Sequence, residues 1–419
     1  MGAKEIIEKV PLYNAIVLPY HMGQAMTAGI RYKFPGKKLR VIGVTGTNGK
    51  TSTCFMIWKM LNHAGHKTGL MTTVAWGVSE LEPELNHMTT VDAMTLNSRI
   101  QKIQKSGAEF LVLEVTSHAM AQFRTLGIPI EIAVFTNLTH DHLDYHKTMK
   151  RYAAAKAKLF KKAKFGVINA DDEHAAGFEL AAGKYITYGV KNGEKRATNI
   201  KMDVSGVSYS CGDINIKTKI PGEFNVYNSL AALCVGEKLG LSKQEIEEGI
   251  FALESVEGRM NIVDEGQDFT VIVDYAHAPD ALEKVYESVA GHKGRTISVH
   301  GGAGRRDPST RPIRGEILAK NSDVVIITED DSRDDDPKVI AQGFVDGATK
   351  AGKVLGKDLF VEMDREKAIE MAINMAKKDD LVLLLGKGHE KTILRADGPH
   401  EFEDIKVARK YLKKLNNKK

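Results

Sequence analysis

The chain has 419 residues, 42% of them hydrophobic and 27% charged, and its 59 basic and 54 acidic residues leave a net charge of only +5. This length predicts two or three domains of an ordinary soluble globular protein, and the small net charge gives no reason to expect nucleic acid as a partner. The three cysteines, Cys54, Cys211 and Cys234, are too scattered for a disulfide framework or a zinc site. Without a signal-peptide core or a run of about 18 apolar residues, a cytoplasmic protein is expected.

Near the N-terminus, the segment from Leu12 to Lys33 mixes apolar and basic residues and contains Pro19. We interpret residues 1–38 as a short N-terminal helical segment. Two hypotheses are open for it: packing on the following domain, which we favour, or contact with a membrane surface.

Residues 44–52, Val-Thr-Gly-Thr-Asn-Gly-Lys-Thr-Ser, lie between an apolar run and a helix predicted over residues 53–62. A strand that ends in small residues lets backbone N–H groups converge on a polyphosphate, with Lys50 reaching the terminal phosphates and the Thr51 hydroxyl holding Mg²⁺. The strict form of this motif has glycine where this chain has Val44. The nucleotide-binding residues predicted in this loop are Gly46, Thr47, Asn48, Gly49, Lys50, Thr51 and Ser52.

Short apolar strands alternate with helical periodicity along nearly the whole chain. Strands are predicted at residues 110–115, 132–136, 166–169, 270–273, 296–300, 324–328 and 381–385. This alternation predicts an α/β fold with doubly wound, mostly parallel sheets. It is interrupted by a predicted hairpin within residues 204–216 and by two helices, 225–239 and 242–253, the second capped by Ser242. A new βαβ pattern follows, so the predicted domains are 39–257 and 258–419.

Two segments carry candidate metal or phosphate ligands directly after apolar strands. Glu114 ends one strand, where it either binds Mg²⁺ or caps the next helix. The other segment, residues 140–146, holds three histidines and two aspartates, a density that favours metal or phosphate chemistry over a structural role. Zinc is the weaker hypothesis because no thiolate accompanies the histidines.

Several motifs together resemble one family. They are Thr-Gly-Thr-Asn-Gly-Lys-Thr-Ser at 45–52, Glu-Val-Thr-Ser-His at 114–118, Phe-Thr-Asn-Leu-Thr-His-Asp-His-Leu-Asp-Tyr-His at 135–146 and Ala-Ala-Lys-Ala-Lys-Leu-Phe at 154–160. Shorter matches follow at 167–173, 221–228, 257–260, 273–282, 364–369 and 386–390. In this order, over roughly residues 39 to 405, they resemble the Mur ligases, and within them the MurE type. The resemblance implies a central P-loop ATPase domain and a C-terminal Rossmann-like domain that binds the incoming amino acid.

This resemblance implies an ATP-dependent, ADP-forming amide ligase of peptidoglycan synthesis, which adds a diamino acid to a UDP-MurNAc-dipeptide-like acceptor through an acyl phosphate. Lys50, Glu114, His142 and Lys156 are the implied catalytic residues. Thr51, Glu114 and His142 are the implied ligands of two Mg²⁺ ions, which spread charge in phosphoryl transfer. By the same resemblance Lys156 is carbamylated by CO₂, and its carbamate takes part in metal binding.

The resemblance also assigns binding residues along both domains. For ATP they are Asn169, bordered by Asp171 and Asp172, then Asn225 and Asn228, and from the second lobe Arg259, Asp274, Tyr275 and His277. For the acceptor and the amino acid they are Thr89, Thr90, Thr116, Ser117, Gln122, Arg124, Arg306, Asp331, Arg333, Gly386 and Glu390.

The sequence departs from the family in the loop that clamps the distal carboxylate of diaminopimelate. The family loop reads Asp-Asn-Pro-Arg, whereas this chain has Asp330-Asp331-Ser332-Arg333, with Glu329 and Asp334 to Asp336 around it. Arg333 suits a carboxylate, while the acidic surroundings suit a distal ammonium. Diaminopimelate, lysine and ornithine therefore all stay open as the added amino acid.

A second departure is that the phosphate loop begins after only about forty residues. This is too short for the usual N-terminal domain that binds uridine diphosphate. Uridine recognition is then either lost or reduced to a short segment, and the muramyl-peptide acceptor is either UDP-linked or lipid-linked.

Two other functions are consistent with parts of the sequence. A folylpolyglutamate or poly-γ-glutamate ligase shares the phosphate loop and the lysine, but the strings at 141–146 and 274–279 favour the MurE type. A non-catalytic Mur-like subunit or binding module has no need to keep Lys50, Glu114, His142 and Lys156 together.

Overall fold

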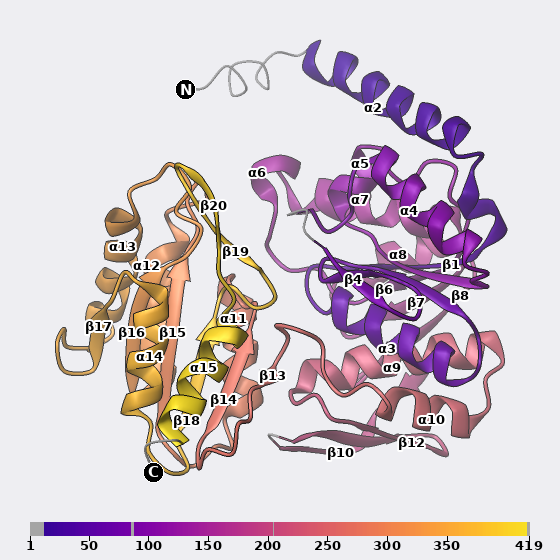
Figure 1. The fold of residues 1–419 in the computed structure, drawn as a ribbon. Coiled ribbons are helices and arrows are strands. Elements are labelled where there is room, and N and C mark those ends of the chain that lie inside the picture. Colours follow the sequence, from indigo (N-terminus) through magenta and orange to yellow (C-terminus); the bar gives the residue numbers. More distant parts are fainter. Residues whose placement is uncertain (1–11, 85–87, 204, 417–419) are drawn as a thin grey trace. The chain divides into compact units, whose positions relative to one another are not determined.

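The computed structural model describes residues 12–84, 88–203 and 205–416 (Figure 1). Residues 1–11 of the predicted N-terminal segment, Val204 of the predicted hairpin and residues 417–419 lie outside the described residues. The chain forms two compact units. The first contains most of the chain up to Leu253, and the second runs from Glu254 onward together with two short segments, 201–207 and 219–223.

A nine-stranded sheet of order β4-β3-β2-β5-β1-β6-β7-β8-β9 organises the first unit. The strands from β2 to β9 in this order are parallel, and β3 and β4 add to one edge in antiparallel pairs. Their bounds are β1 Arg40–Thr45, β2 Thr68–Met71, β3 Ala75–Gly77, β4 Leu81–Pro83, β5 Phe110–Glu114, β6 Ile130–Phe135, β7 Ala163–Asn169, β8 Tyr185–Gly189 and β9 Lys195–Arg196. The predicted α/β fold with mostly parallel strands is confirmed.

Helices cover both faces of this sheet (Figure 1). On one face, Leu113 of β5 and Phe135 of β6 share a core with Ile100 of α4 and Leu159 of α7. On the other face α3 packs against β1, β2 and β5, and α10 packs against α3. The helices of the unit are α2 Leu12–Arg31, α3 Lys50–His63, α4 Ala93–Lys105, α5 Ser117–Ala121, α6 Leu143–His146, α7 Met149–Lys162, α8 Ala175–Ala182, α9 Glu223–Leu239 and α10 Lys243–Phe251, with a 3-10 turn η1 at Pro35–Lys38.

The elements after β9 agree with the sequence pattern. A three-stranded sheet of order β10-β11-β12 has bounds β10 Thr198–Asp203, β11 Gly206–Cys211 and β12 Ile214–Thr218, so the predicted hairpin is present with one strand more. The Ser242 side chain accepts from Glu245 N, and the Glu245 carboxylate accepts from Ser242 N at 2.7 Å. This reciprocal capping box begins α10 where the sequence predicts it.

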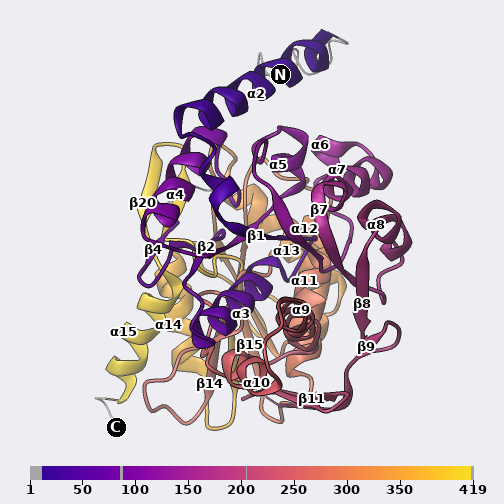
Figure 2. The same cartoon turned by 90° about the vertical axis from the view of Figure 1, so that its right-hand side faces the viewer.

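The N-terminal helix α2 packs on the first unit. Ala25 and Ala28 are buried and form a small core with Ala93 at the start of α4. Figure 2 shows α2 running past α4. Among the described helices, none has the length and apolar content that crossing a membrane requires.

The second unit contains a six-stranded sheet of order β13-β14-β18-β15-β16-β17. All neighbouring pairs are parallel except β13 with β14. The elements are β13 Asn261–Ile262, β14 Thr270–Asp274, α11 Pro279–Val289, β15 Thr296–Gly302, α12 Thr310–Asn321, β16 Val324–Glu329, α13 Pro337–Lys350, β17 Leu359–Val361, α14 Arg365–Met375, β18 Leu381–Leu385, β19 Thr392–Arg395, β20 Gly398–Glu401 and α15 Asp404–Asn416. Strand β18 returns between β14 and β15, which makes a switch point in the strand order.

Alternate residues of these strands face two helical layers. Val299 of β15 and Leu384 of β18 share a core with Ile369 of α14 and Leu412 of α15. From the opposite face the Ser298 hydroxyl of β15 lies 2.8 Å from the Tyr286 hydroxyl of α11. The sheet is therefore buried on both sides, as a parallel sheet requires.

Arg365, the first residue of α14, connects the helices α14 and α15 to the carboxyl ends of two strands. Its guanidinium donates two hydrogen bonds of 2.7 Å to the Asp404 carboxylate, and both side chains are fully buried. It also donates to the Leu385 carbonyl at 3.1 Å and to the Glu329 carbonyl at 3.5 Å. The last residues of β16 and β18 are thus held by one cation.

Replacing Arg365 by methionine leaves the Asp404 carboxylate buried without its partner. We expect this change to lower the free energy of unfolding by about 3–5 kcal/mol, measured by urea denaturation followed by circular dichroism. The double variant R365M/D404L removes both charges, so most of that loss should be recovered. The control Lys367→Met removes an exposed partner of Asp364 and should cost less than about 1 kcal/mol. Equal losses in the single and double variants would contradict this account.

Candidate active site

The loop after β1 is held too tightly for side chains at two of its glycines. A Cβ on Gly46 would lie 1.8 Å from the Thr136 hydroxyl, and one on Gly49 would lie 2.4 Å from Asn228 Oδ1. Gly49 also has a φ of +81°, which favours glycine. Val44, where the strict motif has glycine, is instead a buried residue of β1, paired with Glu114 on β5 and Val134 on β6. The turn therefore starts two residues later than in the strict form.

The carboxyl end of β6 fixes this loop from one side. Asn137 Oδ1 accepts from Asn48 N at 2.9 Å, and Asn137 Nδ2 donates to Asn48 O at 3.1 Å. The Thr136 hydroxyl donates to the same carbonyl at 2.6 Å. The sequence analysis did not assign a role to Asn137, although it lies in the Phe-Thr-Asn string that matched the family.

Thr51 and Glu114 meet at the carboxyl ends of β1 and β5. The Thr51 hydroxyl donates to Glu114 Oε2 at 3.0 Å, and both side chains are buried. The same oxygen accepts from the N–H and the hydroxyl of Thr73, at 3.0 and 3.2 Å. The alternative hypothesis that Glu114 caps the next helix is wrong, because Thr116 is the N-cap of α5. A hydroxyl beside a carboxylate is the oxygen ligand set that Mg²⁺ prefers in nucleotide sites.

Two lysines approach the loop. Lys50 Nζ donates to the Thr47 carbonyl at 2.6 Å, and Lys156 Nζ donates to the Gly46 carbonyl at 2.5 Å. Lys156 is 1% exposed and comes from α7. Burial, and next the Lys50 cation, hold the pKa of Lys156 well below its ordinary value. Lys156 is therefore a buried amine with a reduced tendency to carry a proton.

The three histidines of residues 140–146 have different surroundings. His140 is exposed, whereas His146 is buried with its Nε2 2.9 Å from the Ser117 hydroxyl. His142 has a left-handed backbone, lies 3.4 Å from the Asp141 carboxylate and packs edge-on against His118. The histidines that the sequence pattern grouped together therefore differ in role. His146 is structural, and the metal-binding role of His142 stays a prediction.

Four of the predicted acceptor residues of the first unit, Thr90, Thr116, Gln122 and Arg124, form one network beside Glu114. The Thr90 hydroxyl donates to the Glu114 carbonyl at 2.9 Å and accepts from Thr116 N at 3.1 Å. Arg124 donates to the Thr90 carbonyl and, at 2.6 Å, to Gln122 Oε1. Burial lowers the pKa of Arg124 from its ordinary value. A polar surface with one half-buried guanidinium therefore lies at the end of β5.

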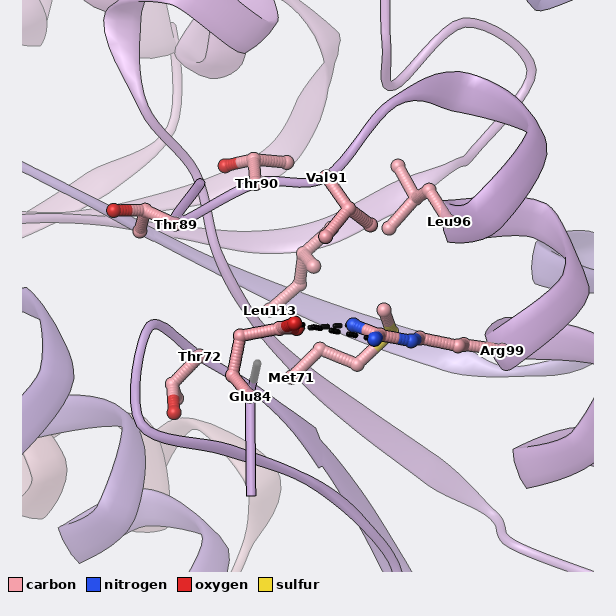
Figure 3. Close-up of a pocket in the computed structure, with 9 residues that line it drawn as sticks. All are labelled: Met71, Thr72, Glu84, Thr89, Thr90, Val91, Leu96, Arg99 and Leu113. Atoms are coloured by element: carbon pink, nitrogen blue, oxygen red, sulfur yellow. Dashed lines mark hydrogen bonds and ion pairs between the residues drawn. The ribbon is translucent and has the colours of Figure 1, made fainter. Parts of the chain in front are cut away.

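Thr89 and Thr90 also line a small pocket whose other wall is an ion pair (Figure 3). Figure 3 shows Glu84 and Arg99 pointing toward one another, and the Arg99 guanidinium lies 4.6 Å from the centroid of the Trp76 ring. Glu84 precedes residues 85–87, which lie outside the described part. The sequence analysis assigned no role to this pair, because its members are distant from any recognised motif.

The asparagines predicted near the nucleotide form hydrogen bonds with neighbouring side chains and, in the case of Asn169, with backbone. Asn228 Oδ1 accepts from the Thr53 hydroxyl at 3.2 Å, and its Nδ2 donates to Asn225 Oδ1 at 2.9 Å. Asn169 donates to the Thr136 carbonyl at 2.7 Å. The two neighbouring aspartates accept from backbone N–H groups, Asp171 from residues 190–192 and Asp172 from Leu138. These side chains shape the surroundings of the loop after β1.

In the second unit, most of the predicted residues lie at or after the carboxyl ends of β14, β15, β16 and β18, whereas Arg259 precedes β13. The Arg259 guanidinium stacks 4.6 Å from the centroid of the Tyr275 ring, and the Tyr275 hydroxyl donates to Glu390 Oε1 at 3.3 Å. Buried Asp274 accepts from Met260 N and Ala276 N, both at 2.7 Å. Exposed His277 has its Nδ1 2.9 Å from the Tyr275 carbonyl.

The loop Asp330–Arg333 has a different charge balance from the one the sequence suggested. Its acidic neighbours are engaged: Glu329 with Arg395, Asp334 with Arg305, Asp335 with Arg311, and Asp336 as the N-cap of α13. The acidity that is not balanced in this way belongs to Asp330, Asp331 and Glu390, which share one lysine, Lys387. Of the other predicted residues, Arg333 is half-buried and donates to the Gly304 carbonyl at 3.1 Å. Gly386 adjoins Asp330, and Arg306 is exposed.

Comparisons with known proteins agree with this geometry. Two family models match: the Mur ligase middle domain over residues 44–236, and the "Mur ligase, glutamate ligase domain" over residues 258–388. The UDP-N-acetylmuramoyl-L-alanyl-D-glutamate–2,6-diaminopimelate ligase 1 of Clostridium acetobutylicum is 38% identical over 432 residues, which cover 99% of this chain and 88% of the relative. A solved structure with the same ligase name is 33% identical, with a TM-score of 0.65 over 90% of this chain and 79% of the other.

A second solved structure bears on the folylpolyglutamate alternative. The folylpolyglutamate synthase of Mycobacterium tuberculosis, solved with ADP and AMPPCP, has a TM-score of 0.71 over 93% of this chain and 94% of the other. Its sequence identity is 15%, so this likeness concerns the fold alone.

Glutamine at position 114 keeps the shape of the glutamate but removes its charge. We expect Glu114→Gln to weaken Mg²⁺-dependent ATP binding about 10–100-fold, measured by isothermal titration calorimetry with and without Mg²⁺. Glu109→Gln is the matched control, since Glu109 lies exposed just before the same strand and pairs with Arg40. The same Mg²⁺ dependence in Glu114→Gln and the unchanged chain would refute the ligand role.

Proposed function

Because this chain belongs to the Mur ligase family and is an ATP-dependent amide ligase of the MurE type, we propose that it joins a free diamino acid to the peptide carboxylate of a UDP-linked muramyl dipeptide. The observation that carries the proposal is the buried contact between Thr51 and Glu114 beside Lys50 and Lys156. A protein that only binds would have no need for this set. Since ATP is a cytoplasmic substrate, we assign the enzyme to the cytoplasm.

The first step proposed is phosphoryl transfer. An oxygen of the acceptor carboxylate attacks the γ-phosphorus of ATP, ADP leaves, and an acyl phosphate forms. Both reactants are negative, so their approach needs cations: Lys50 supplies one, and the family uses Mg²⁺ to spread the charge of the phosphates. Thr51 and Glu114 would hold that Mg²⁺, with His142 as a further ligand. The network of Thr90, Thr116, Gln122 and Arg124, together with Thr89 and Ser117, would bind the acceptor.

The second step proposed is aminolysis in the second unit's site. The amine nitrogen of the diamino acid attacks the acyl carbon, the C–N bond forms, phosphate leaves and the nitrogen loses a proton. Asp331 and Glu390 would orient ammonium groups of the amino acid, and Arg333 would pair with a carboxylate. We infer 2,6-diaminopimelate as the first candidate, because Arg333 is retained and the Clostridium acetobutylicum relative is named for that substrate.

We also propose that Lys156 carries a carbamate. Its neutral nitrogen attacks CO₂, an N–C bond forms, and release of one proton leaves a carbamate anion. The supporting observations are the full burial of Lys156 and its depressed pKa, since only the unprotonated amine reacts. A carbamate there would help to hold a second Mg²⁺ or to position the γ-phosphate group.

The function is tested by coupled ADP release across a panel of acceptors and amino acids. UDP-linked and lipid-linked muramyl dipeptides and a folate are combined with diaminopimelate, lysine, ornithine or glutamate, and products are identified by mass spectrometry. We expect ADP and an amide product from the UDP-linked dipeptide with diaminopimelate. ADP release with folate and glutamate alone would favour the folylpolyglutamate alternative, and no release with any pair would favour a non-catalytic subunit.

The carbamate is tested by ¹³C NMR of the protein in ¹³C-bicarbonate. The unchanged chain should show a carbamate carbon that is missing in Lys156→Arg, because arginine keeps the charge without an amine that reacts. Turnover of Lys156→Arg should fall at least about 100-fold. Lys158→Arg, an exposed neighbour on the same helix, should keep both the signal and the turnover. The same ¹³C signal in both variants would exclude Lys156 as the site.

A further inference from the structure

Lys387 joins the two loops of the second unit that carry the amino-acid site. Its side chain is fully buried, and its Nζ lies 2.6 Å from Asp331 Oδ1, 2.6 Å from Glu390 Oε2 and 3.3 Å from Asp330 Oδ1. An ammonium group has three N–H donors. Two of these donors form hydrogen bonds with Asp331 and Glu390, and Asp330 forms an ion pair with the same ammonium.

Lys387 alone does not neutralise the three carboxylates that surround it. Burial alone would lower the pKa of Lys387, but the carboxylates, Asp330 first, outweigh it and hold that pKa above its ordinary value. Burial raises the pKa of Glu390, while Lys387 opposes the rise. Burial raises the pKa of Asp330, but the Lys387 and Arg365 cations and a backbone hydrogen bond together outweigh burial and keep that pKa low. Among the described side chains, Lys387 is the one cation that forms ion pairs with these three carboxylates, so a further cation would be attracted.

The same oxygens would attract a metal if the lysine were not there. Within the described ranges, Asp330, Asp331 and Glu390 are the one group of three carboxylate, imidazole or thiol side chains whose ligand atoms lie within 4.8 Å of one another. Lys387 already lies at hydrogen-bonding distance from two of these carboxylates. The arrangement suits an ammonium group that adds its own N–H donors better than a bare divalent ion.

Other contacts fix the orientation of each carboxylate. Asp331 Oδ1 accepts from Leu394 N at 3.0 Å as well as from Lys387, so among the described groups Oδ2 is left for a ligand. The Tyr275 hydroxyl donates to Glu390 Oε1. Gly386 has a φ of +106°, and a Cβ there would lie 3.2 Å from Asp330 Oδ2. The loop thus approaches the carboxylates as closely as glycine permits.

We propose that Lys387 is the positioning residue of the amino-acid site. Its ammonium offsets the mutual repulsion between the Asp331 and Glu390 carboxylates. It also orients Asp331 so that one oxygen faces the ammonium groups of the incoming diamino acid. Lys387 contacts neither ATP nor the reacting carbonyl, so its replacement changes the affinity for the amino acid. This inference rests on the proposed ligase function and adds to it a residue that sets the charge of the site.

The test compares steady-state kinetics of Lys387→Met with those of the unchanged ligase. KM for the amino acid should rise at least about 30-fold, while KM for ATP and for the acceptor should change less than about twofold, because those ligands use other residues. Lys387→Arg should recover part of the loss, since it restores the cation. Lys391→Met is the matched control, because Lys391 lies on the same loop and pairs with Glu257 and Glu403. An unchanged KM for the amino acid in folded Lys387→Met would overturn the proposal.

Removal of Lys387 leaves buried carboxylates that can unfold the unit. The double variant D330N/K387M removes one of those charges and keeps both proposed amino-acid contacts, Asp331 and Glu390, and its folding is checked by circular dichroism. We expect it to fold and still to show the raised KM. If the unchanged ligase forms no amide with any diamino acid, the proposed function fails; if it does and the folded double variant keeps a normal KM, only the role of Lys387 fails.

A pH profile separates positioning from a general structural role. Without Lys387 the pKa values of Asp330 and Glu390 rise, so at neutral pH these groups are more protonated and attract the substrate less. The ratio of variant to unchanged KM should therefore fall between about pH 7 and about pH 9 as these groups ionise. The charged or titratable groups around them are Tyr275, His300, Arg314, Arg365 and Lys387. A ratio that does not change with pH would contradict the charge argument.

Discussion

The hydrogen bond from the Thr51 hydroxyl to the Glu114 carboxylate is the contact on which the chemistry that we propose for the first unit depends. It exists because β1 and β5 are parallel neighbours whose carboxyl ends meet at one edge of the sheet. Asn137, after β6, holds the same loop from the other side. A side chain at Gly46 would collide with Thr136 and separate these groups. The phosphate loop therefore needs its particular strand order, and the motif alone would not be enough.

Both units place their polar side chains after the ends of parallel strands, but with opposite charge. In the first unit Lys50 and Lys156 approach the phosphate loop, which suits a reaction between anions. In the second, Asp330, Asp331 and Glu390 exceed the charge of Lys387, which suits an amine. The two steps that we propose for amide formation require different electrostatics, and we propose that each unit supplies one of them.

Features with a strong local signal were predictable from sequence. The parallel strands follow from their apolar runs, the capping box from Ser242 and Glu245, and the phosphate loop from its glycines. Contacts between distant residues were not predictable in this way. Arg395 neutralises Glu329 from 66 positions away, so a loop that looks crowded with acid is largely balanced. Thr73, Asn137 and the pair of Glu84 with Arg99 have no motif of their own, and only the folded chain brings them to the site.

The most direct measurement of the central claim follows one oxygen atom. The acceptor carboxylate is labelled with ¹⁸O, and the phosphate released during a single round of amide formation is examined by mass spectrometry. If the carboxylate attacks the γ-phosphorus and the amine then displaces phosphate, each phosphate must carry one ¹⁸O from the acceptor. Phosphate without the label would show that ATP is hydrolysed by water, and would contradict the acyl-phosphate ligase described here.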